Sequence, residues 1–186
     1  LDSLSPAQVL LIDRALTALG ANALNQYRER RQDALMERTR ERPLPAGRIS
    51  PRGALVWGLG TSVMGTAVLA AWSGVWPAAL AALTVLLYVL VYTPLKRVST
   101  VNTAVGAVCG AIPPVIGWTA AGGGLGLGAW LLFALLFVWQ MPHFFALAWM
   151  YRDDYARGGF KMLPVLDPQG RLTFPVTALF ALLLNR

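Results

Sequence analysis

The sequence is poor in charged side chains and has a single cysteine and a single histidine. Charged residues make up 13% of its 186 positions, about half of the roughly 25% that is usual in soluble domains. A soluble domain needs polar side chains over its whole surface, so this deficit excludes an ordinary soluble enzyme and a disordered tail. The lone Cys109 excludes an internal disulfide framework and, within an apolar run, predicts a buried, inert thiol. The first ten residues lack the basic start of a cleavable signal peptide.

Hydrophobic residues, by contrast, make up 56% of the chain and lie in long runs. A helix of about 20 apolar residues crosses the roughly 30 Å of hydrocarbon in a bilayer. Four runs approach or exceed that length: 54–71, 76–93, 101–121 and 125–150. We expect two further helices, over 7–23, which Asp13 and Arg14 interrupt, and over 172–184, which is short. The sequence therefore predicts an all-α, polytopic transmembrane helix bundle of about six helices, one domain over 1–186, truncated at both ends.

The positive charge of the chain follows a pattern along these runs. The formal net charge of +7 would suggest nucleic-acid binding in a soluble protein. However, 14 of the 16 Lys and Arg residues fall in alternate connections, 28–52, 94–100 and 151–171. Positively charged loops of membrane proteins face the cytoplasm. We therefore expect an integral protein of a bacterial plasma (inner) membrane, with these loops on the cytoplasmic side, and no nucleic-acid partner.

Polar residues gather where the run 7–23 gives way to the first basic connection. Asn22, Asn25, Glu29 and Asp33 are spaced by three or four residues, which places them along one face of a helix. Amide and carboxylate oxygens are hard ligands of the kind that Mg²⁺ shares with substrate phosphates. The alternative is a polar helix end that emerges into water and forms ion pairs with neighbouring arginines.

A second acidic pair, Asp153 and Asp154, follows the apolar run that carries His143. On a continuous helix His143 and Asp154 would lie three turns apart and on nearly the same face. This alignment suggests a role for His143 deeper in a cavity than the acidic pair. The alternatives are a histidine that bonds a neighbouring helix, and aspartates that pair with Arg152 and Arg157 in a loop.

Arg38 and Arg42 form a cationic pair one helical turn apart, shortly after Asp33. Guanidinium groups bind phosphate in bidentate fashion, so this pair suits a diphosphate held beside a metal. The alternative is that these arginines only orient the chain and contact anionic lipid.

Six motifs occur in an order that resembles a known family. They are Asn-Ala-Leu-Asn-Gln at 22–26, 36–44 around Arg-Thr-Arg-Glu-Arg-Pro, Tyr-Thr-Pro-Leu-Lys-Arg at 92–97, 110–118, Trp-Gln-Met-Pro-His-Phe at 139–144, and Tyr-Arg-Asp-Asp-Tyr at 151–155 with 162–164. Together they resemble the haem-farnesylating (protohaem IX farnesyltransferase) branch of the UbiA-type membrane prenyltransferases, over about 21–165. That family usually has aspartate where Glu29 stands and often another where Arg31 stands.

The resemblance implies a helix bundle around a cavity in which two acidic motifs hold Mg²⁺ and a prenyl diphosphate. It implies farnesyl transfer from farnesyl diphosphate to a vinyl group of haem B, which is a substrate and not a cofactor, to give haem O. The expected metal ligands are Asn25, Glu29, Asp33, Asp153 and Asp154. The expected catalytic residues are Asn22, Arg38, Arg42 and His143, and the expected substrate-binding residues are Arg38, Arg42, Lys96, Arg97, His143 and Tyr151.

Expected partners are the lipid bilayer and, among proteins, haem A synthase or oxidase assembly factors. Other functions stay open at this point. The same diphosphate site would serve prenyl transfer to an aromatic quinone precursor, and a non-catalytic haem-handling membrane subunit is a third interpretation. A transporter is disfavoured because its charges would lie near the bilayer midplane, whereas these cluster at one face.

Overall fold

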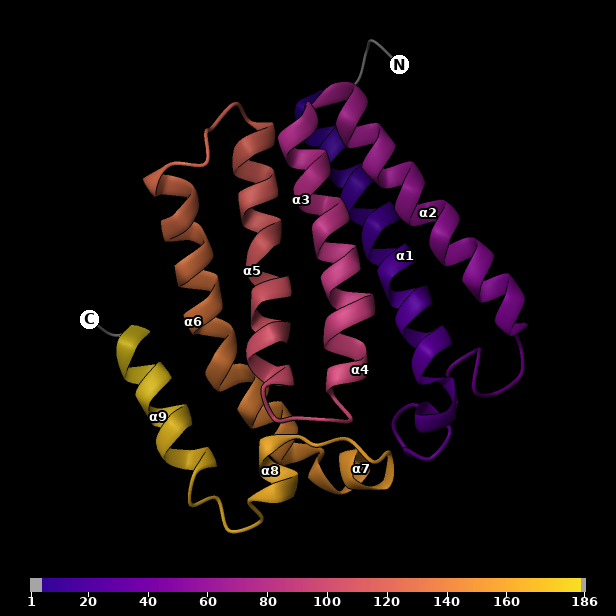
Figure 1. The fold of residues 1–186 in the computed structure, drawn as a ribbon, viewed down its shortest axis with the longest axis vertical. Coiled ribbons are helices and arrows are strands. Elements are labelled where there is room, and N and C mark those ends of the chain that lie inside the picture. Colours follow the sequence, from indigo (N-terminus) through magenta and orange to yellow (C-terminus); the bar gives the residue numbers. More distant parts are fainter. Residues whose placement is uncertain (1–4, 185–186) are drawn as a thin grey trace.

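The chain folds into a bundle of helices that run roughly side by side (Figure 1). A computed structural model describes residues 5–184, and within them it contains helices and no strands. The helices are α1 (Pro6–Asp33), α2 (Pro51–Trp72), α3 (Val75–Leu86), the π-helical segment η1 (Leu87–Tyr92), α4 (Thr93–Leu95), α5 (Asn102–Ala120), α6 (Leu127–Met150), α7 (Arg152–Arg157), α8 (Leu163–Leu166) and α9 (Thr173–Leu184). Because α3, η1 and α4 follow one another without a break, the described chain has five long rods and the shorter α9, which confirms the predicted all-α bundle of about six helices.

The first two helices begin where the sequence supplies caps. The Ser5 hydroxyl accepts a hydrogen bond from the Gln8 N–H, and the Gln8 side chain accepts one from the Ser5 N–H, which is a capping box. The Ser50 hydroxyl caps α2 with a single hydrogen bond, which it accepts from the Gly53 N–H. The helix predicted over 7–23 continues to Asp33, because residues 24–33 are mostly good helix formers. Its 28 residues make a rod about 42 Å long.

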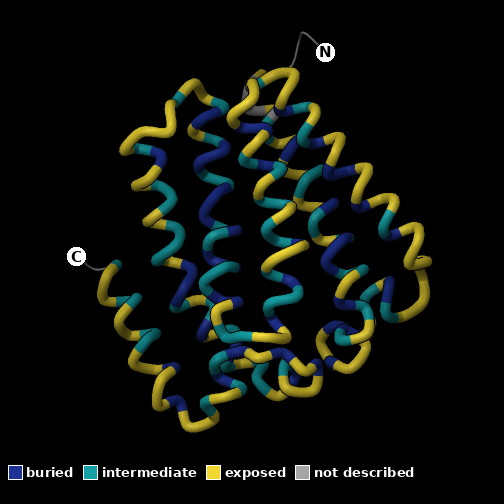
Figure 2. The backbone as a smooth tube through the Cα atoms, in the orientation of Figure 1, coloured by how far each residue is buried: buried dark blue, intermediate teal, exposed yellow. Residues whose placement is uncertain are grey.

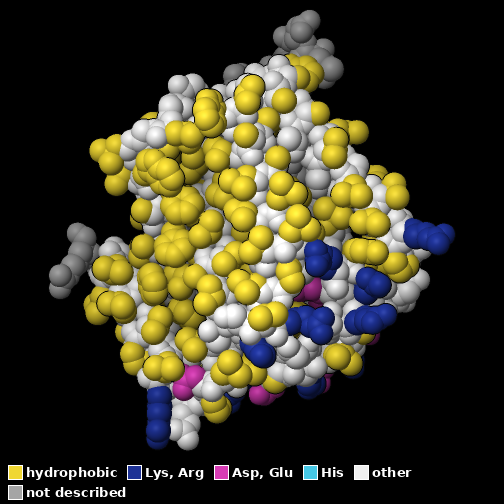
Figure 3. Space-filling model, viewed as in Figure 1, with side chains coloured by type: hydrophobic (Ala, Val, Ile, Leu, Met, Phe, Trp, Pro, Cys, Tyr) yellow, Lys and Arg dark blue, Asp and Glu magenta, His cyan; other side chains and the backbone are white. Residues whose placement is uncertain are grey.

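Four rods are long and apolar enough to cross a membrane, as the runs in the sequence predict. They are Pro51–Trp72, Val75–Leu95, Asn102–Ala120 and Leu127–Met150. The α9 helix is apolar but has only 12 residues, and α1 carries too many polar residues to meet the same standard. Much of the outer surface is exposed and hydrophobic (Figures 2 and 3). Such a surface suits contact with lipid tails and not with water.

Small residues bring α1 and α2 into close contact. A methyl group added at Gly20 would lie 2.2 Å from the Ser62 hydroxyl, and one at Gly65 would lie 2.7 Å from the Thr17 side chain. Glycine at these positions lets the two backbones approach each other, as in many membrane helix pairs. This packing fixes α1, which carries the predicted acidic row.

The connections of the bundle divide between its two ends. Residues 34–50, 96–101 and 151–172 lie at one end together with α7 and α8, and residues 73–74 and 121–126 lie at the other (Figure 1). We call the former the basic end, since it carries the Lys and Arg residues of the three predicted loops. On the face drawn in Figure 3, Lys and Arg side chains gather towards this end. The alternation of charge therefore predicted correctly which loops lie together.

Candidate active site

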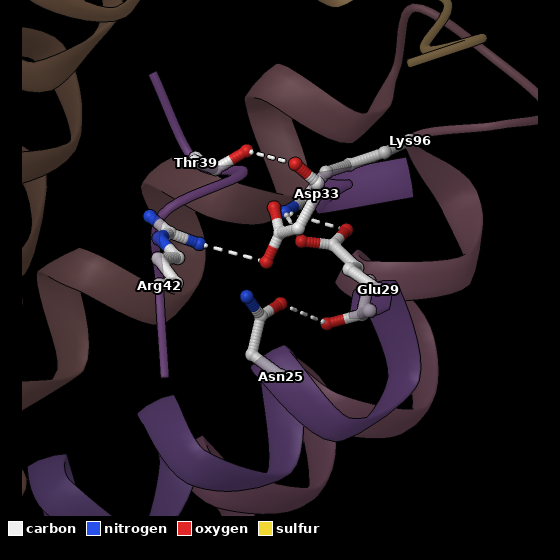
Figure 4. A network of polar contacts seen from close by, with 7 residues as sticks. Asn25, Glu29, Asp33, Thr39, Arg42 and Lys96 are labelled. Carbon is white, nitrogen blue, oxygen red and sulfur yellow. Dashed lines mark hydrogen bonds and ion pairs between the residues drawn. The ribbon is translucent and has the colours of Figure 1, made fainter. Parts of the chain in front are cut away.

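Three of the four predicted polar residues on α1 form a buried row. Asn25, Glu29 and Asp33 are 7%, 5% and 1% exposed, and they lie one turn apart near the basic end (Figure 4). Asn22, the fourth, is exposed and is not part of this row. A buried row of oxygen atoms needs compensating donors, because a buried carboxylate without a partner is costly.

Each member of the row has one partner from another part of the chain. The Lys96 ammonium lies 2.8 Å from both carboxylate oxygens of Glu29, and Lys96 itself is only 8% exposed. The Arg42 guanidinium donates to Asp33 at 3.0 Å. The Thr93 hydroxyl lies 2.9 Å from the Asn25 side-chain oxygen. Two elements therefore supply the donors: the end of the α3–α4 rod and the connection after α1 (Figure 4).

The π-helical segment explains how the α3–α4 rod presents its donors. The Thr93 hydroxyl also lies 2.7 Å from the carbonyl of Tyr88, five residues earlier, which is the spacing of a π turn. On the same segment the Tyr92 ring packs against Gly106 of α5, where an added methyl group would lie 2.8 Å from the ring. Wide turns of this kind occur often at functional sites. Here the turn directs Thr93 towards the row on α1.

The connection 34–50 folds back over the end of α1 and is held there at two points. The Thr39 hydroxyl donates to the Asp33 backbone carbonyl at 2.9 Å, and Thr39 is 1% exposed. Met36 is buried in an apolar cluster with Ala148, Phe160 and Met162 from the α6–α8 region. These contacts place Arg42 beside Asp33.

The two aspartates of the second motif have different surroundings. Asp154 accepts hydrogen bonds from the backbone N–H groups of Glu37 at 3.0 Å and Arg38 at 3.1 Å, and from the Arg157 side chain. The Arg157 guanidinium first, and then the two N–H groups, hold the pKa of Asp154 below its usual range. Asp153 is exposed and lies 3.7 Å from Arg152. Asp154 therefore anchors the connection 34–50, and Asp153 is the accessible carboxylate.

Two further predicted cationic residues, Arg38 and Arg97, are exposed at the basic end. The Arg38 guanidinium stacks over the Tyr151 ring at 4.9 Å and near the Tyr155 ring at 5.9 Å. This contact holds the guanidinium of Arg38, which the sequence predicts to bind phosphate, at the basic end. Arg97 is exposed, unlike its neighbour Lys96.

The predicted alignment of His143 with Asp154 is wrong. Helix α6 ends at Met150, and Tyr151, with φ −107° and ψ 23°, separates it from α7. The three-turn argument required a continuous helix, so it does not hold. His143 is exposed on the side of α6 and stacks against Trp139, with ring centroids 5.4 Å apart. Its predicted role in haem binding stays a prediction.

The donor set of the α1 row suits a hard divalent cation. Its side-chain oxygens belong to one amide and two carboxylates, which is the chemistry that Mg²⁺ prefers. One oxygen of Glu29, Oε1, is buried and accepts no well-aligned hydrogen bond, although the Lys96 ammonium lies 2.8 Å from it. Among residues 5–184, however, no three His, Cys, Asp or Glu side chains converge as a ready-made metal cluster. The two acidic motifs are brought to the same end of the bundle but not into one cluster.

Two residues of this arrangement were not predicted as parts of the site. Thr93 and Thr39 connect the row to the α3–α4 rod and to the 34–50 connection. Thr93 belongs to the motif at 92–97, so its place beside Lys96 was a usable signal. Thr39 likewise belongs to the motif at 36–44, between the two predicted arginines.

A family model described as "UbiA prenyltransferase family" matches residues 3–185. The chain belongs to the UbiA prenyltransferase family. Among curated members, it is similar to "Protoheme IX farnesyltransferase" of Solibacter usitatus, with 50% identity over 88% of this chain and 56% of the relative. It is also similar to the protein of that name in Salinibacter ruber, with 51% identity over 94% of this chain and 62% of the relative. The chain thus spans about six tenths of the length of these relatives, or less.

A solved UbiA homologue from Archaeoglobus fulgidus, described as bound to DMAPP and Mg²⁺, has the same fold. Its TM-score is 0.71 at 19% sequence identity, with 97% of this chain and 65% of that chain covered. The likeness extends over nearly all of the bundle. It supports the helical architecture of the UbiA family described above, and the chain is an integral membrane protein by family and by its four apolar rods.

The buried pair of Lys96 and Glu29 generates the first prediction. Lys96→Met leaves Glu29 as an uncompensated buried carboxylate, which should lower the free energy of unfolding by about 3–5 kcal/mol. If the row accepts a divalent cation, millimolar Mg²⁺ should restore part of that loss, since a cation binding the folded state stabilises it. Chemical unfolding in detergent micelles, with Mg²⁺ and with a chelator, measures both effects. The control Arg97→Met, at the exposed neighbour, should show neither the loss of stability nor the effect of Mg²⁺. If Lys96→Met loses the same unfolding free energy with and without Mg²⁺, the row does not bind a metal.

The anchoring role of Asp154 generates the second prediction. In Asp154→Asn only one side-chain oxygen remains and it is neutral, so one of the N–H groups of Glu37 and Arg38 loses its acceptor and the other loses a charged one. Hydrogen exchange at those two amides should become about tenfold faster or more. In the parent protein the anchor should persist at neutral pH and weaken only as the pH falls below about 4, because the pKa of Asp154 is lowered on folding. Asp153→Asn is the matched control, and faster exchange there to the same extent would refute the distinction between the two aspartates.

Proposed function

We propose that this chain is the prenyl-diphosphate-binding part of a membrane farnesyltransferase that converts haem B into haem O. The observation that carries the proposal is the buried row Asn25, Glu29 and Asp33, which lies beside Arg42 and Lys96 at the end of an apolar bundle. A row of hard ligands next to cations suits a metal diphosphate, and the apolar helices suit a farnesyl tail. Identities of about 50% to relatives named "Protoheme IX farnesyltransferase" favour haem B as the acceptor.

In this proposal Asn25, Glu29 and Asp33 hold Mg²⁺, with the accessible Asp153 as a further ligand. When bound, Mg²⁺ neutralises the charge that develops on the departing diphosphate. Arg38 binds the phosphate oxygens in bidentate fashion from its position over the tyrosine rings. Because these groups are held before substrate arrives, little reorganisation is needed as the charge develops.

Lys96 and Arg42 have two roles in this mechanism, one without substrate and one with it. Without substrate they neutralise Glu29 and Asp33, and with substrate they stand within reach of the diphosphate oxygens. The allylic C–O bond of farnesyl diphosphate breaks, the vinyl carbon of haem B forms a bond to the farnesyl carbon, and water then supplies the hydroxyl group of haem O. Apolar helices keep water away until the carbon–carbon bond has formed. His143, Tyr151 and Arg97 are proposed to contact haem B or its propionates.

The proposed location is the bacterial plasma membrane, with the basic end towards the cytoplasm. The support is the distribution of Lys and Arg among the loops, which lie together at one end of the bundle. Farnesyl diphosphate and the propionate groups of haem B are anionic, so a basic end also suits both substrates. Contacts with haem A synthase or oxidase assembly factors are proposed because haem O would need an acceptor system.

The third prediction tests the activity. Membranes containing the protein should convert haem B to haem O when farnesyl diphosphate and Mg²⁺ are both supplied, as detected by mass spectrometry. Asp33→Ala should reduce turnover by at least 100-fold, about 2.7 kcal/mol of transition-state stabilisation, while Glu41→Gln, at an exposed loop carboxylate, should leave it unchanged. Prenylation of 4-hydroxybenzoate in place of haem B would contradict haem B as the acceptor. It would be consistent with the proposed diphosphate site.

The fourth prediction tests the orientation. A cysteine at Ala46, in an exposed part of the basic end, should be protected from an impermeant thiol reagent added outside intact cells. A cysteine at Gly124, at the opposite end, should react, since a side chain added there would meet no atom within 4 Å. Gly123 is less suitable because an added side chain would meet Trp118 at 2.3 Å. The buried Cys109 should stay silent, and the reverse labelling pattern would place the basic end outside.

A further inference from the structure

A groove lies between three helices of the bundle, and no residue of the acidic row lines it. Helix α1 forms its floor, and α2 and the α3–η1 rod form its walls, with a volume of about 900 Å³. In Figure 1 α1 is visible between these two walls. Within residues 5–184 the groove is partly open to the surroundings, and its volume is in the range of sites that hold whole organic molecules.

The walls of the groove suit a hydrocarbon chain. Small side chains, among them Ala67 and Ala70 on α2 and Ala82 on α3, leave the space between the helices open. The two wall hydroxyls are already satisfied, because Ser62 donates to the Gly58 carbonyl at 2.7 Å and Thr66 to the Ser62 carbonyl at 2.9 Å. No polar group of the walls therefore requires water or a polar ligand.

The charge of the groove lies at one end only. Arg28 and Arg30 line it close to the basic end, and its described lining contains no Asp or Glu. Arg30 donates to the Tyr27 carbonyl at 2.6 Å and stacks over the Tyr27 ring at 4.8 Å. Arg28 is exposed and, within residues 5–184, its guanidinium makes no hydrogen bond, ion pair or ring contact. An unpaired guanidinium at the end of an apolar groove is a receptor for an anionic head group.

The groove differs from the diphosphate site in two respects. Its floor is formed by Leu24, Tyr27 and Arg28, whereas Asn25 and Glu29 turn towards the α3–α4 rod. It therefore offers cations but no metal ligands, which suits a phosphate of single charge better than a metal diphosphate. Along α2 the groove extends from Leu55 to Ala70, about 22 Å. One leaflet contributes about 15 Å of hydrocarbon, so the groove accommodates one tail and reaches the head-group level.

We propose that this groove is a binding site for an anionic phospholipid of the surrounding bilayer. One acyl chain lies between α2 and α3–η1, and the phosphate group binds Arg28, with Arg30 as the second cation. The site is separate from the proposed catalytic site, because no residue of the row Asn25, Glu29 and Asp33 lines the groove. The negative charge of the lipid is the specific element of the proposal, since any lipid satisfies the apolar walls.

The test uses the purified protein in neutral detergent, with dioleoylphosphatidylglycerol as the anionic probe and dioleoylphosphatidylcholine as the neutral one. Native mass spectrometry and thermal unfolding report lipid binding. The parent protein should bind the anionic lipid at least tenfold more tightly than the neutral one. Arg28→Gln should remove most of this preference, and the fold should be retained because Arg28 contacts nothing that holds the helix. Ala67→Trp, which fills the groove from an exposed position, should weaken binding of both lipids.

The matched controls are Arg31→Gln, at an exposed arginine of α1 outside the groove, and Ala71→Trp, at an exposed alanine of α2 outside it. Both should behave as the parent protein does. Equal binding of the two lipids by the parent, or an equal effect of Arg31→Gln and Arg28→Gln, would overturn the proposal. Displacement of the anionic lipid by stoichiometric farnesyl diphosphate would also overturn it and assign the groove to the substrate. Failure of farnesyl transfer alone would not affect it.

Discussion

The ion pair between Glu29 and Lys96 is the interaction on which the site depends. Both side chains are about nine-tenths buried or more, and their charged atoms lie 2.8 Å apart. Removing one partner from such a pair leaves a charge without compensation, which costs several kcal/mol. The pair therefore obliges the end of the α3–α4 rod to stay against α1, and the Arg42–Asp33 pair does the same for the connection 34–50.

These two ion pairs explain two irregular features of the bundle, the π-helical segment η1 and the connection 34–50. The wide turn η1 brings Thr93 onto the row, and Asp154 fixes the backbone of the connection that carries Arg38 and Arg42. A divalent cation would take the place of Lys96 and Arg42 beside the carboxylates, and these two cations would then be available to an anionic ligand. In the absence of ligand the two cations offset the charge of the carboxylates in a low-dielectric surrounding.

Regular patterns of apolar and charged residues in the sequence predicted most of the fold. Apolar runs predicted the four spanning rods, alternating charge predicted which loops share an end, and the spacing of three to four predicted the row on α1. Contacts between distant segments could not be predicted from the sequence. Nothing in it indicates that Glu29 pairs with Lys96, 67 residues later. Nor does it indicate that Asp154 accepts hydrogen bonds from the N–H groups of residues 37 and 38. The alignment of His143 with Asp154 failed because a single residue, Tyr151, leaves the helical conformation.

The central claim is that the row on α1 holds the cation that binds the diphosphate, and Mn²⁺ in place of Mg²⁺ allows a direct measurement. Electron–nuclear double resonance on the protein with Mn²⁺ and a non-reactive farnesyl diphosphate analogue reports phosphorus nuclei near the metal. Selective ¹⁵N labelling of asparagine reports the Asn25 side chain, which Asn25→Asp identifies by loss of the signal. We expect coupling of one Mn²⁺ to both phosphorus and the Asn25 amide. Coupling to phosphorus without coupling to Asn25, and unchanged in Asp33→Ala, would place the metal elsewhere and contradict the claim.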